Sequence, residues 1–274
     1  MEQSEQKLKV LARISEYEKA GRFNDDVEDD PPTIIIRPKD VDYVNKKLSS
    51  KILTSFANFL GKTFFESMIK KNKFIIKEIT GLENAAAVKG GAIVTGNHFN
   101  ICDNYALYRA LKPVFRKRQY LYKVIKEGNY NNFKGPIGLM MRHANTLPLS
   151  SDFETMKKFY AGVKTLLSRG EKILIYPEQA MWFNYRKPRP MQLGAFRLAA
   201  KYNVPIIPAF ICMKDSEYLD NDGFPVQEYY MHFFPAIYPD EKLSEKENAE
   251  KMREKNYELW VNRYEEFYNE KLTY

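Results

Sequence analysis

The chain has 274 residues, 44% of them hydrophobic, so it can bury a large core as one main domain. Its longest apolar run, residues 204–213, is about half the ~20 residues that a membrane-spanning helix needs, so we expect no such helix. Two cysteines are too few for the disulfide framework of a small secreted protein, and the acidic N-terminus lacks the apolar part of a secretory signal. We therefore expect a cytoplasmic protein.

The N-terminal residues predict one helix followed by a linker. Apolar side chains recur at helical spacing over residues 4–20, and Gly21 is a typical helix stop. An acidic linker follows and ends in two prolines at Pro32. We assign residues 1–32 to this helix and linker and expect them to be a peripheral appendage.

The net charge of +8 is concentrated in residues 43–77, which contain eight lysines and one acidic residue. Apolar side chains recur there every three or four residues, which predicts a basic amphipathic helix, or two helices divided near Gly61. Such helices lie in the headgroup region of anionic membranes, so we expect residues 33–73 to associate with the inner face of the cell membrane. The alternative is a helix packed on the protein with a solvated lysine face. Nucleic acid is not an expected partner, because no recognisable reader motif is present.

Residues 74–274 alternate between strand and helix patterns. The expected strands are 74–80, 91–95, 119–124, 146–149, 172–176, 204–211 and 229–234, and the expected helices are 104–111, 153–167, 194–202 and 244–268. This alternation predicts an α/β domain with a single mixed, mostly parallel sheet flanked by helices. The last helix carries Tyr257, Trp260, Tyr264 and Phe267 on one stripe, so we expect its aromatic side chains to dock it on the domain.

His98 and Asp103 lie five positions apart, between the strand expected at 91–95 and the helix expected at 104–111. A histidine whose tautomer is fixed by a carboxylate can take a proton from an alcohol at neutral pH. The pair alone is a weak signal, because chance can produce this spacing. The alternative is a helix-capping Asn97 with a hydrogen-bonded histidine behind it.

A second polar cluster follows the strand expected at 172–176. Glu178 comes directly after Pro177, where we expect a solvent-reachable carboxylate at the strand end. Three cations then follow within four residues, namely Arg186, Lys187 and Arg189. Arginine can hold phosphate oxygens bidentately and lysine can add a point charge. This segment is therefore either a phosphate-binding loop or a solvated surface loop.

Taken in order, these segments resemble the glycerolipid acyltransferases typified by 1-acylglycerol-3-phosphate acyltransferase. Asn97, His98 and Asp103 match the family's first block, Asn-His-x4-Asp. The segment 176–181, Tyr-Pro-Glu-Gln-Ala-Met, is similar to the third block, Phe-Pro-Glu-Gly-Thr-Arg, and 204–208 is similar to the fourth, an apolar Val-Pro-Ile strand that ends in proline. The resemblance covers roughly residues 75–212.

The resemblance implies transfer of a fatty acyl group from acyl-carrier protein or coenzyme A to the hydroxyl of a lysophospholipid, most directly 1-acylglycerol-3-phosphate, in phospholipid biosynthesis. It implies that His98 is the base, that Asp103 orients it and that Glu178 contributes to acceptor binding. The other residues that we assign to substrate binding are Asn97, Gln179, Arg186, Lys187 and Arg189. Thioester transfer needs no metal or redox cofactor, and we expect none.

The sequence departs from the family pattern at two cations. The second block, Pro-x-x-Gly in the family, begins similarly here with Gly135-Pro136-Ile137-Gly138, but Ser150-Ser151-Asp152 stands where the family has an arginine that contacts acceptor phosphate. Met181 replaces the arginine of the third block. Arg186, Lys187 and Arg189, or else Arg142 or Lys157, can supply the missing charge. The competing explanations are a phosphate-free or larger lysolipid acceptor and a non-catalytic membrane-surface protein.

Overall fold

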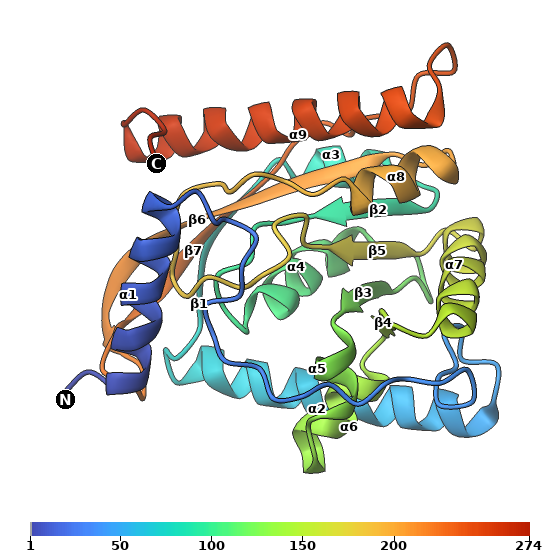
Figure 1. Ribbon diagram of the computed structural model, residues 1–274, viewed down its shortest axis with the longest axis horizontal. Coiled ribbons are helices and arrows are strands. Elements are labelled where there is room, and N and C mark those ends of the chain that lie inside the picture. Colours follow the sequence, from blue (N-terminus) through green and yellow to red (C-terminus); the bar gives the residue numbers. More distant parts are fainter. Residues whose placement is uncertain (1) are drawn as a thin grey trace.

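The computed structural model describes residues 2–274 and contains a seven-stranded sheet in the order β1-β7-β6-β2-β5-β3-β4, with helices on both faces (Figure 1). The strands are β1 Ile75–Thr80, β2 Ala92–Thr95, β3 Leu121–Ile125, β4 Thr146–Pro148, β5 Lys172–Ile175, β6 Ile206–Leu219 and β7 Pro225–Phe233. All neighbouring strands are parallel except β6 and β7, which form an antiparallel pair. The predicted mixed, mostly parallel sheet is confirmed.

The helices cover both faces of this sheet. They are α1 Glu5–Lys19, α2 Leu48–Lys70, α3 Leu82–Ala87, α4 Asp103–Leu111, α5 Glu127–Asn131, α6 Gly135–His143, α7 Phe153–Ser168, α8 Gly194–Lys201 and α9 Glu245–Tyr268. Several begin at side-chain caps, as at Asp152 for α7 and in the Ser244–Glu247 capping box of α9. The long predicted helices are all present, whereas the short α3, α5 and α6 were not predicted.

Two hydrophobic layers enclose the sheet, because successive strand residues point to opposite faces. Ile93 and Ile173 pack with α7, α8 and α9, and Val94 and Leu174 pack with α4 and α2. Trp260 of α9 is fully buried in the first layer. The predicted docking of the last helix through its aromatic side chains is therefore confirmed.

The N-terminal segment packs on the domain and is not the peripheral appendage expected from the sequence. Val10 and Ile14 of α1 are buried in a cluster with Trp182, Phe183 and Phe224. The segment that follows, residues 22–36, we call the N-terminal strap; in Figure 1 it runs down from the top of α1 and continues alongside α5. The packing of the strap could not be predicted from its acidic sequence, because its two buried apolar residues, Val27 and Ile36, are not part of a periodic pattern.

The basic amphipathic segment forms one unbroken helix, α2, of 23 residues. Ala57 and Gly61 are its buried residues, and a Cβ atom on Gly61 would lie 3.6 Å from the Met140 sulfur of α6. Gly61 therefore faces α6 and does not divide the helix. The opposite side of α2 exposes large apolar side chains, Leu48, Ile52, Phe56 and Phe59. Within residues 2–274, no helix is long and apolar enough to cross a membrane.

Candidate active site

The order of the strands in the sheet brings the two predicted clusters to one edge. β2, β5 and β3 are adjacent and parallel, so their carboxyl ends lie together. The arrowheads of β2 and β5 in Figure 1 point toward α1. The turn that carries His98 follows β2, and the loop that carries Glu178 follows β5. This edge is where ligands usually bind in open α/β folds.

His98 and Asp103 form the hydrogen-bonded pair that the sequence suggested. The Nδ1 atom of His98 lies 3.0 Å from Oδ2 of Asp103. The same oxygen accepts the backbone N–H groups of Phe99 and Asn100, each at 2.8 Å. Asp103 is fully buried, while the His98 side chain is 18% exposed. Because Nδ1 is occupied, Nε2 is the nitrogen of His98 that is left to accept a proton.

Two tyrosines complete the surroundings of this pair. The hydroxyl of Tyr229, on β7, donates a hydrogen bond of 3.1 Å to Oδ1 of Asp103. Burial, reinforced by Asp103, raises the pKa of Tyr229 well above its ordinary value, so the phenol stays protonated as a donor. The ring of Tyr176 stacks on His98 with centroids 4.0 Å apart and an interplanar angle of 7°. Neither contact is predicted by a local pattern in the sequence.

Glu178 is buried and holds the loops in place, contrary to the expected solvent-reachable carboxylate. Its Oε2 atom accepts the backbone N–H of His98 at 3.1 Å and a guanidinium N–H of Arg189 at 3.2 Å. Its Oε1 atom accepts the backbone N–H of Arg189 at 2.8 Å. Both carboxylate oxygens are thus occupied within the protein, and Glu178 connects the His98 turn to the Arg189 segment.

Arg189 is 1% exposed, so it does not face a ligand as the sequence suggested. Its guanidinium donates to the carbonyl of Phe23 at 2.9 Å and lies 4.7 Å from the ring centroid of Trp182. Burial lowers the pKa of the Arg189 guanidinium, and Glu178 opposes that shift. A buried cation of this kind requires its paired carboxylate.

Asn97 and Gln179 occupy different environments. The side chain of Asn97 is buried. Its amide N–H donates to the carbonyl of Ile211 at 3.0 Å, and its amide oxygen accepts the N–H of Ile211 at 2.9 Å, so Asn97 holds the His98 turn against β6. Gln179 is exposed and has a φ of 65°. The resembling block has glycine there, the residue that adopts this left-handed conformation without steric cost.

The three cations expected to form a phosphate-binding loop point in separate directions. Arg186 pairs with Asp215 of β6 at 2.9 Å, and Lys187 pairs with Glu18 of α1 at 2.5 Å. Arg189 is buried as described above. The reason is that acids distant in sequence approach the loop from β6 and from α1, which the local pattern of charges cannot reveal.

The other two cations proposed for the acceptor phosphate, Arg142 and Lys157, also have partners within the protein. Arg142 donates to the backbone carbonyls of Tyr130 and Phe133, and Lys157 pairs with Glu154. Cys102 is buried, and burial, aided by Asp103, raises the pKa of its thiol to about 12. A thiol with that pKa is protonated at neutral pH and is a poor nucleophile.

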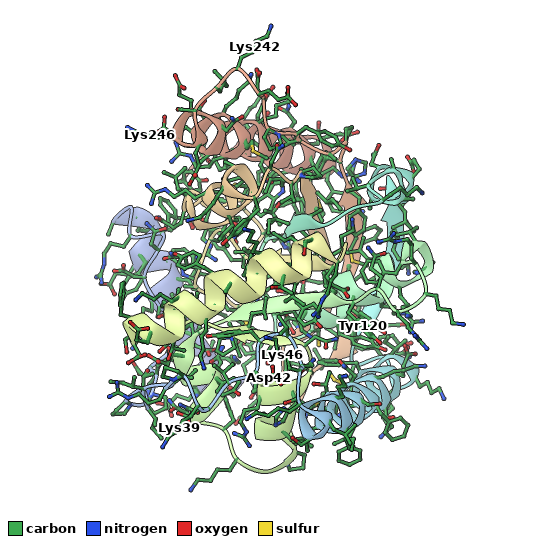
Figure 2. The ribbon with its side chains drawn as sticks, turned by 90° about the vertical axis from the view of Figure 1, so that its right-hand side faces the viewer. Lys39, Asp42, Lys46, Tyr120, Lys242 and Lys246 are labelled. Atoms are coloured by element: carbon green, nitrogen blue, oxygen red, sulfur yellow. The ribbon has the colours of Figure 1, made fainter. Side chains whose placement is uncertain are left out.

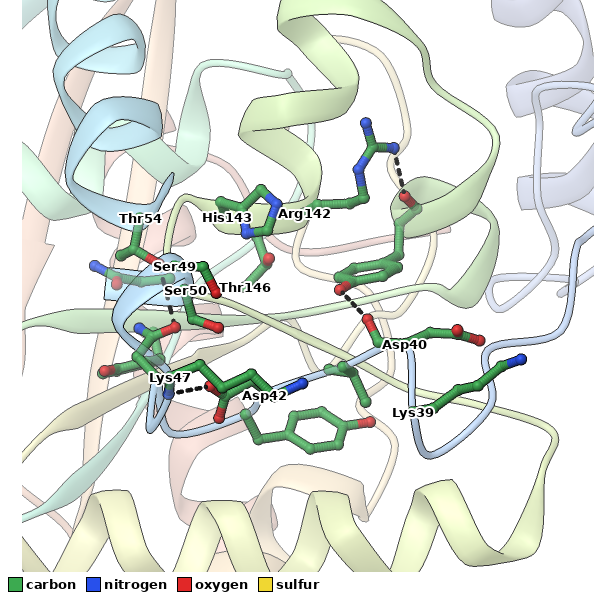
Figure 3. Close-up of a pocket in the computed structure, with 16 residues that line it drawn as sticks. Lys39, Asp40, Asp42, Lys47, Ser49, Ser50, Thr54, Arg142, His143 and Thr146 are labelled. Carbon is green, nitrogen blue, oxygen red and sulfur yellow. Dashed lines mark hydrogen bonds between the residues drawn. The ribbon is translucent and has the colours of Figure 1, made fainter. Parts of the chain in front are cut away.

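A polar cavity of about 150 Å³ lies away from this site, beside the amino end of β4 (Figure 3). It is lined by residues that include Asp42, Lys47, His143 and Thr146. Figure 2 views the molecule from this side, with Asp42 and Lys46 labelled between α7 and α2. Asp42 accepts the backbone N–H of Lys47 at 3.0 Å, so a side chain of the protein already occupies the amino end of α2. Of the residues proposed from the sequence for catalysis or substrate binding, Arg142, an alternative cation for the acceptor phosphate, lines this cavity, whereas His98, Asp103 and Glu178 do not.

A family model described as acyltransferase matches residues 77–212, about half of the chain, and this range includes His98, Asp103 and Glu178. The chain belongs to this acyltransferase family and is an acyltransferase. A similar solved structure is the crystal structure of the 1-acyl-sn-glycerophosphate (LPA) acyltransferase PlsC from Thermotoga maritima, with a TM-score of 0.54, 17% identity and coverage of 82% of this chain and 83% of that chain. At this identity the likeness establishes the shared fold. No curated protein matches the chain in sequence.

Proposed function

We propose that this acyltransferase moves a fatty acyl group from a thioester to the free hydroxyl of a lysolipid, with His98 as general base. The observation that carries the proposal is the 3.0 Å bond between His98 and the buried Asp103 at the carboxyl edge of the sheet. Asp103 holds the proton on Nδ1 and leaves Nε2 free to accept one.

The reaction proceeds by direct transfer. Nε2 of His98 removes the hydroxyl proton as the oxygen attacks the thioester carbonyl, so no free alkoxide forms. The new oxygen–carbon bond replaces the carbon–sulfur bond, and the departing thiolate receives the proton from His98. Asp103 stays ionised throughout and stabilises the imidazolium that forms between these steps.

The family and the similar solved structure support the choice of substrate classes. The similar structure from Thermotoga maritima acts on 1-acyl-sn-glycerophosphate, as its name states. We propose a lysophospholipid acceptor and an acyl-carrier protein or coenzyme A donor, with a role in phospholipid biosynthesis. The headgroup of the acceptor is a separate question, because the cations expected to bind phosphate are paired within the protein.

We also propose that α2 places the enzyme on an anionic membrane. Leu48, Ile52, Phe56 and Phe59 recur at steps of three and four residues and are all at least half exposed. Lysines are interleaved with them along the same helix, as at Lys51 and Lys62. An apolar face with neighbouring lysines suits the boundary between headgroups and acyl chains, where a lysolipid is presented.

The function is tested with one labelled acyl thioester and a panel of lysolipid acceptors. We expect the label to appear in a diacyl lipid, and Cys102→Ala to retain the activity because its thiol takes no part. Label found only in free fatty acid would indicate a hydrolase. Absence of any turnover, with lipid binding retained, would instead indicate a non-catalytic lipid-binding protein.

A further inference from the structure

Lys126 is a cation at the same sheet edge as His98, and two acids of the N-terminal strap cover it. It follows β3 directly, and its ammonium lies 2.5 Å from Asp26 and 3.4 Å from Asp30. The side chains of all three are substantially exposed. A polar ligand at this edge would therefore meet Lys126 and the two carboxylates together.

A short series of contacts places this group beside the catalytic turn. The backbone N–H of Trp182 donates to the carbonyl of His98 at 3.1 Å. The indole N–H of Trp182 donates to the carbonyl of Asp25 at 3.0 Å. The next residue of the strap is Asp26, which contacts Lys126. Trp182 therefore links the His98 turn to the strap at Asp25, one residue before the acid that contacts Lys126.

Buried contacts fix the strap on both sides of these acids. Val27 is 1% exposed and Ile36 is fully buried. The carbonyl of Phe23 accepts from Arg189 at 2.9 Å, and the N–H of Ile36 donates to Glu127 at 2.7 Å. Exposed ion pairs contribute little to stability, so these buried contacts, and not the ion pairs, keep Asp26 and Asp30 beside Lys126.

We propose that Asp26 and Asp30 select the acceptor, disfavouring a phosphomonoester such as 1-acylglycerol-3-phosphate relative to a lysolipid with an uncharged or zwitterionic headgroup. This inference rests on the proposed acyl transfer to a lysolipid. The two carboxylates outweigh the single positive charge of Lys126, so the group repels a dianionic phosphate. The cations of the 186–189 segment do not compensate, because each is paired with an acid.

The test is the ratio of kcat/KM for lysophosphatidic acid to kcat/KM for monoacylglycerol, measured for the wild type and for Asp26→Asn/Asp30→Asn. The asparagines keep the side-chain shape and remove both charges. We expect the ratio to rise about tenfold, because an unmasked ammonium then attracts the phosphate. Adding Lys126→Met to this variant should bring the ratio to a value between those of the double variant and the wild type, because the group then carries no charge.

Asp29→Asn is the matched control, since Asp29 lies on the same strap but pairs with Arg13 at 2.9 Å and is 90% exposed. Its ratio should equal that of the wild type. An unchanged ratio in Asp26→Asn/Asp30→Asn, or a gain that Lys126→Met does not reduce, would overturn the selection proposal while leaving acyl transfer intact. Absence of transfer to every acceptor by the wild type would overturn the proposed function, and the selection proposal with it.

Discussion

Asp103 is the residue whose contacts define the catalytic geometry. One of its oxygens receives His98 and two backbone N–H groups, and the other receives the hydroxyl of Tyr229. A carboxylate held by four donors can neither rotate nor move toward the substrate. The tautomer and direction of His98 are thus set by contacts that exist before any substrate binds.

Tyr229→Phe tests this view of Asp103. The substitution removes one hydrogen bond to a buried carboxylate and leaves the ring packing in place. We expect kcat to fall about tenfold, in line with the loss of a hydrogen bond to a charged group. KM for donor and acceptor should stay unchanged, because the Tyr229 hydroxyl bonds to Asp103 and its ring packs on Phe74 and Phe99.

Tyr230→Phe provides the comparison, because the Tyr230 hydroxyl donates to Glu228 and not to the site. It should leave both constants at the wild-type values. A rise in KM with constant kcat for Tyr229→Phe would mean that Tyr229 binds substrate, which contradicts a positioning role.

At the level of elements, the loop after β5 depends on the buried pair of Glu178 and Arg189. Both are almost fully buried, and removing one partner of such a pair leaves an uncompensated charge. We expect Glu178→Gln to lower the free energy of unfolding by about 3 kcal/mol, measured by denaturant titration. Arg186→Gln, which breaks an exposed pair, should cost less than about 1 kcal/mol.

This result separates two roles for Glu178. If the Glu178 carboxylate bound the acceptor, its substitution would raise KM for the acceptor and leave the free energy of unfolding unchanged. Loss of stability with little specific change in KM is the outcome that a structural role predicts.

For the whole molecule, the exposed apolar face of α2 predicts membrane binding. The wild type should float with anionic vesicles in a density gradient, and Ile52→Ser/Phe56→Ser/Phe59→Ser should bind at least about tenfold more weakly, because it removes most of the apolar face. Phe153→Ser, which removes an exposed phenylalanine from α7, is the control. Equal flotation of the triple variant and the wild type would rule out attachment through α2.

The strands and helices could be predicted from the sequence where they depend on local patterns of apolar residues. Strands such as β2 and β5 are short apolar runs bounded by polar or glycine residues, and the long helices have periodic apolar faces. β6 extends beyond its predicted end at 211 because its later residues pair with β7. Residues 214–219 are mostly exposed, so they lack the apolar pattern that would predict this part of the strand. The packing of the strap depends on contacts such as Asp26 with Lys126, about a hundred residues apart, which no local pattern encodes.

The same distinction applies to the site. His98 and Asp103 are five residues apart, so their pairing could be predicted from one turn. Tyr229 reaches Asp103 from 126 residues away through the order of strands in the sheet. The inward direction of Arg189 depends on Glu178, Phe23 and Trp182 together, so a segment that looked like a phosphate-binding loop proved to be a structural support.

The role of His98 as general base is tested by the rate of diacyl-lipid formation from a labelled acyl thioester by His98→Ala, compared with the wild type at equal folded concentration. We expect kcat to fall by about 10²- to 10⁴-fold, the usual contribution of a general base, while the unfolding temperature stays close to that of the wild type. A His98→Ala enzyme that forms the diacyl lipid within a few-fold of the wild-type rate would contradict this role.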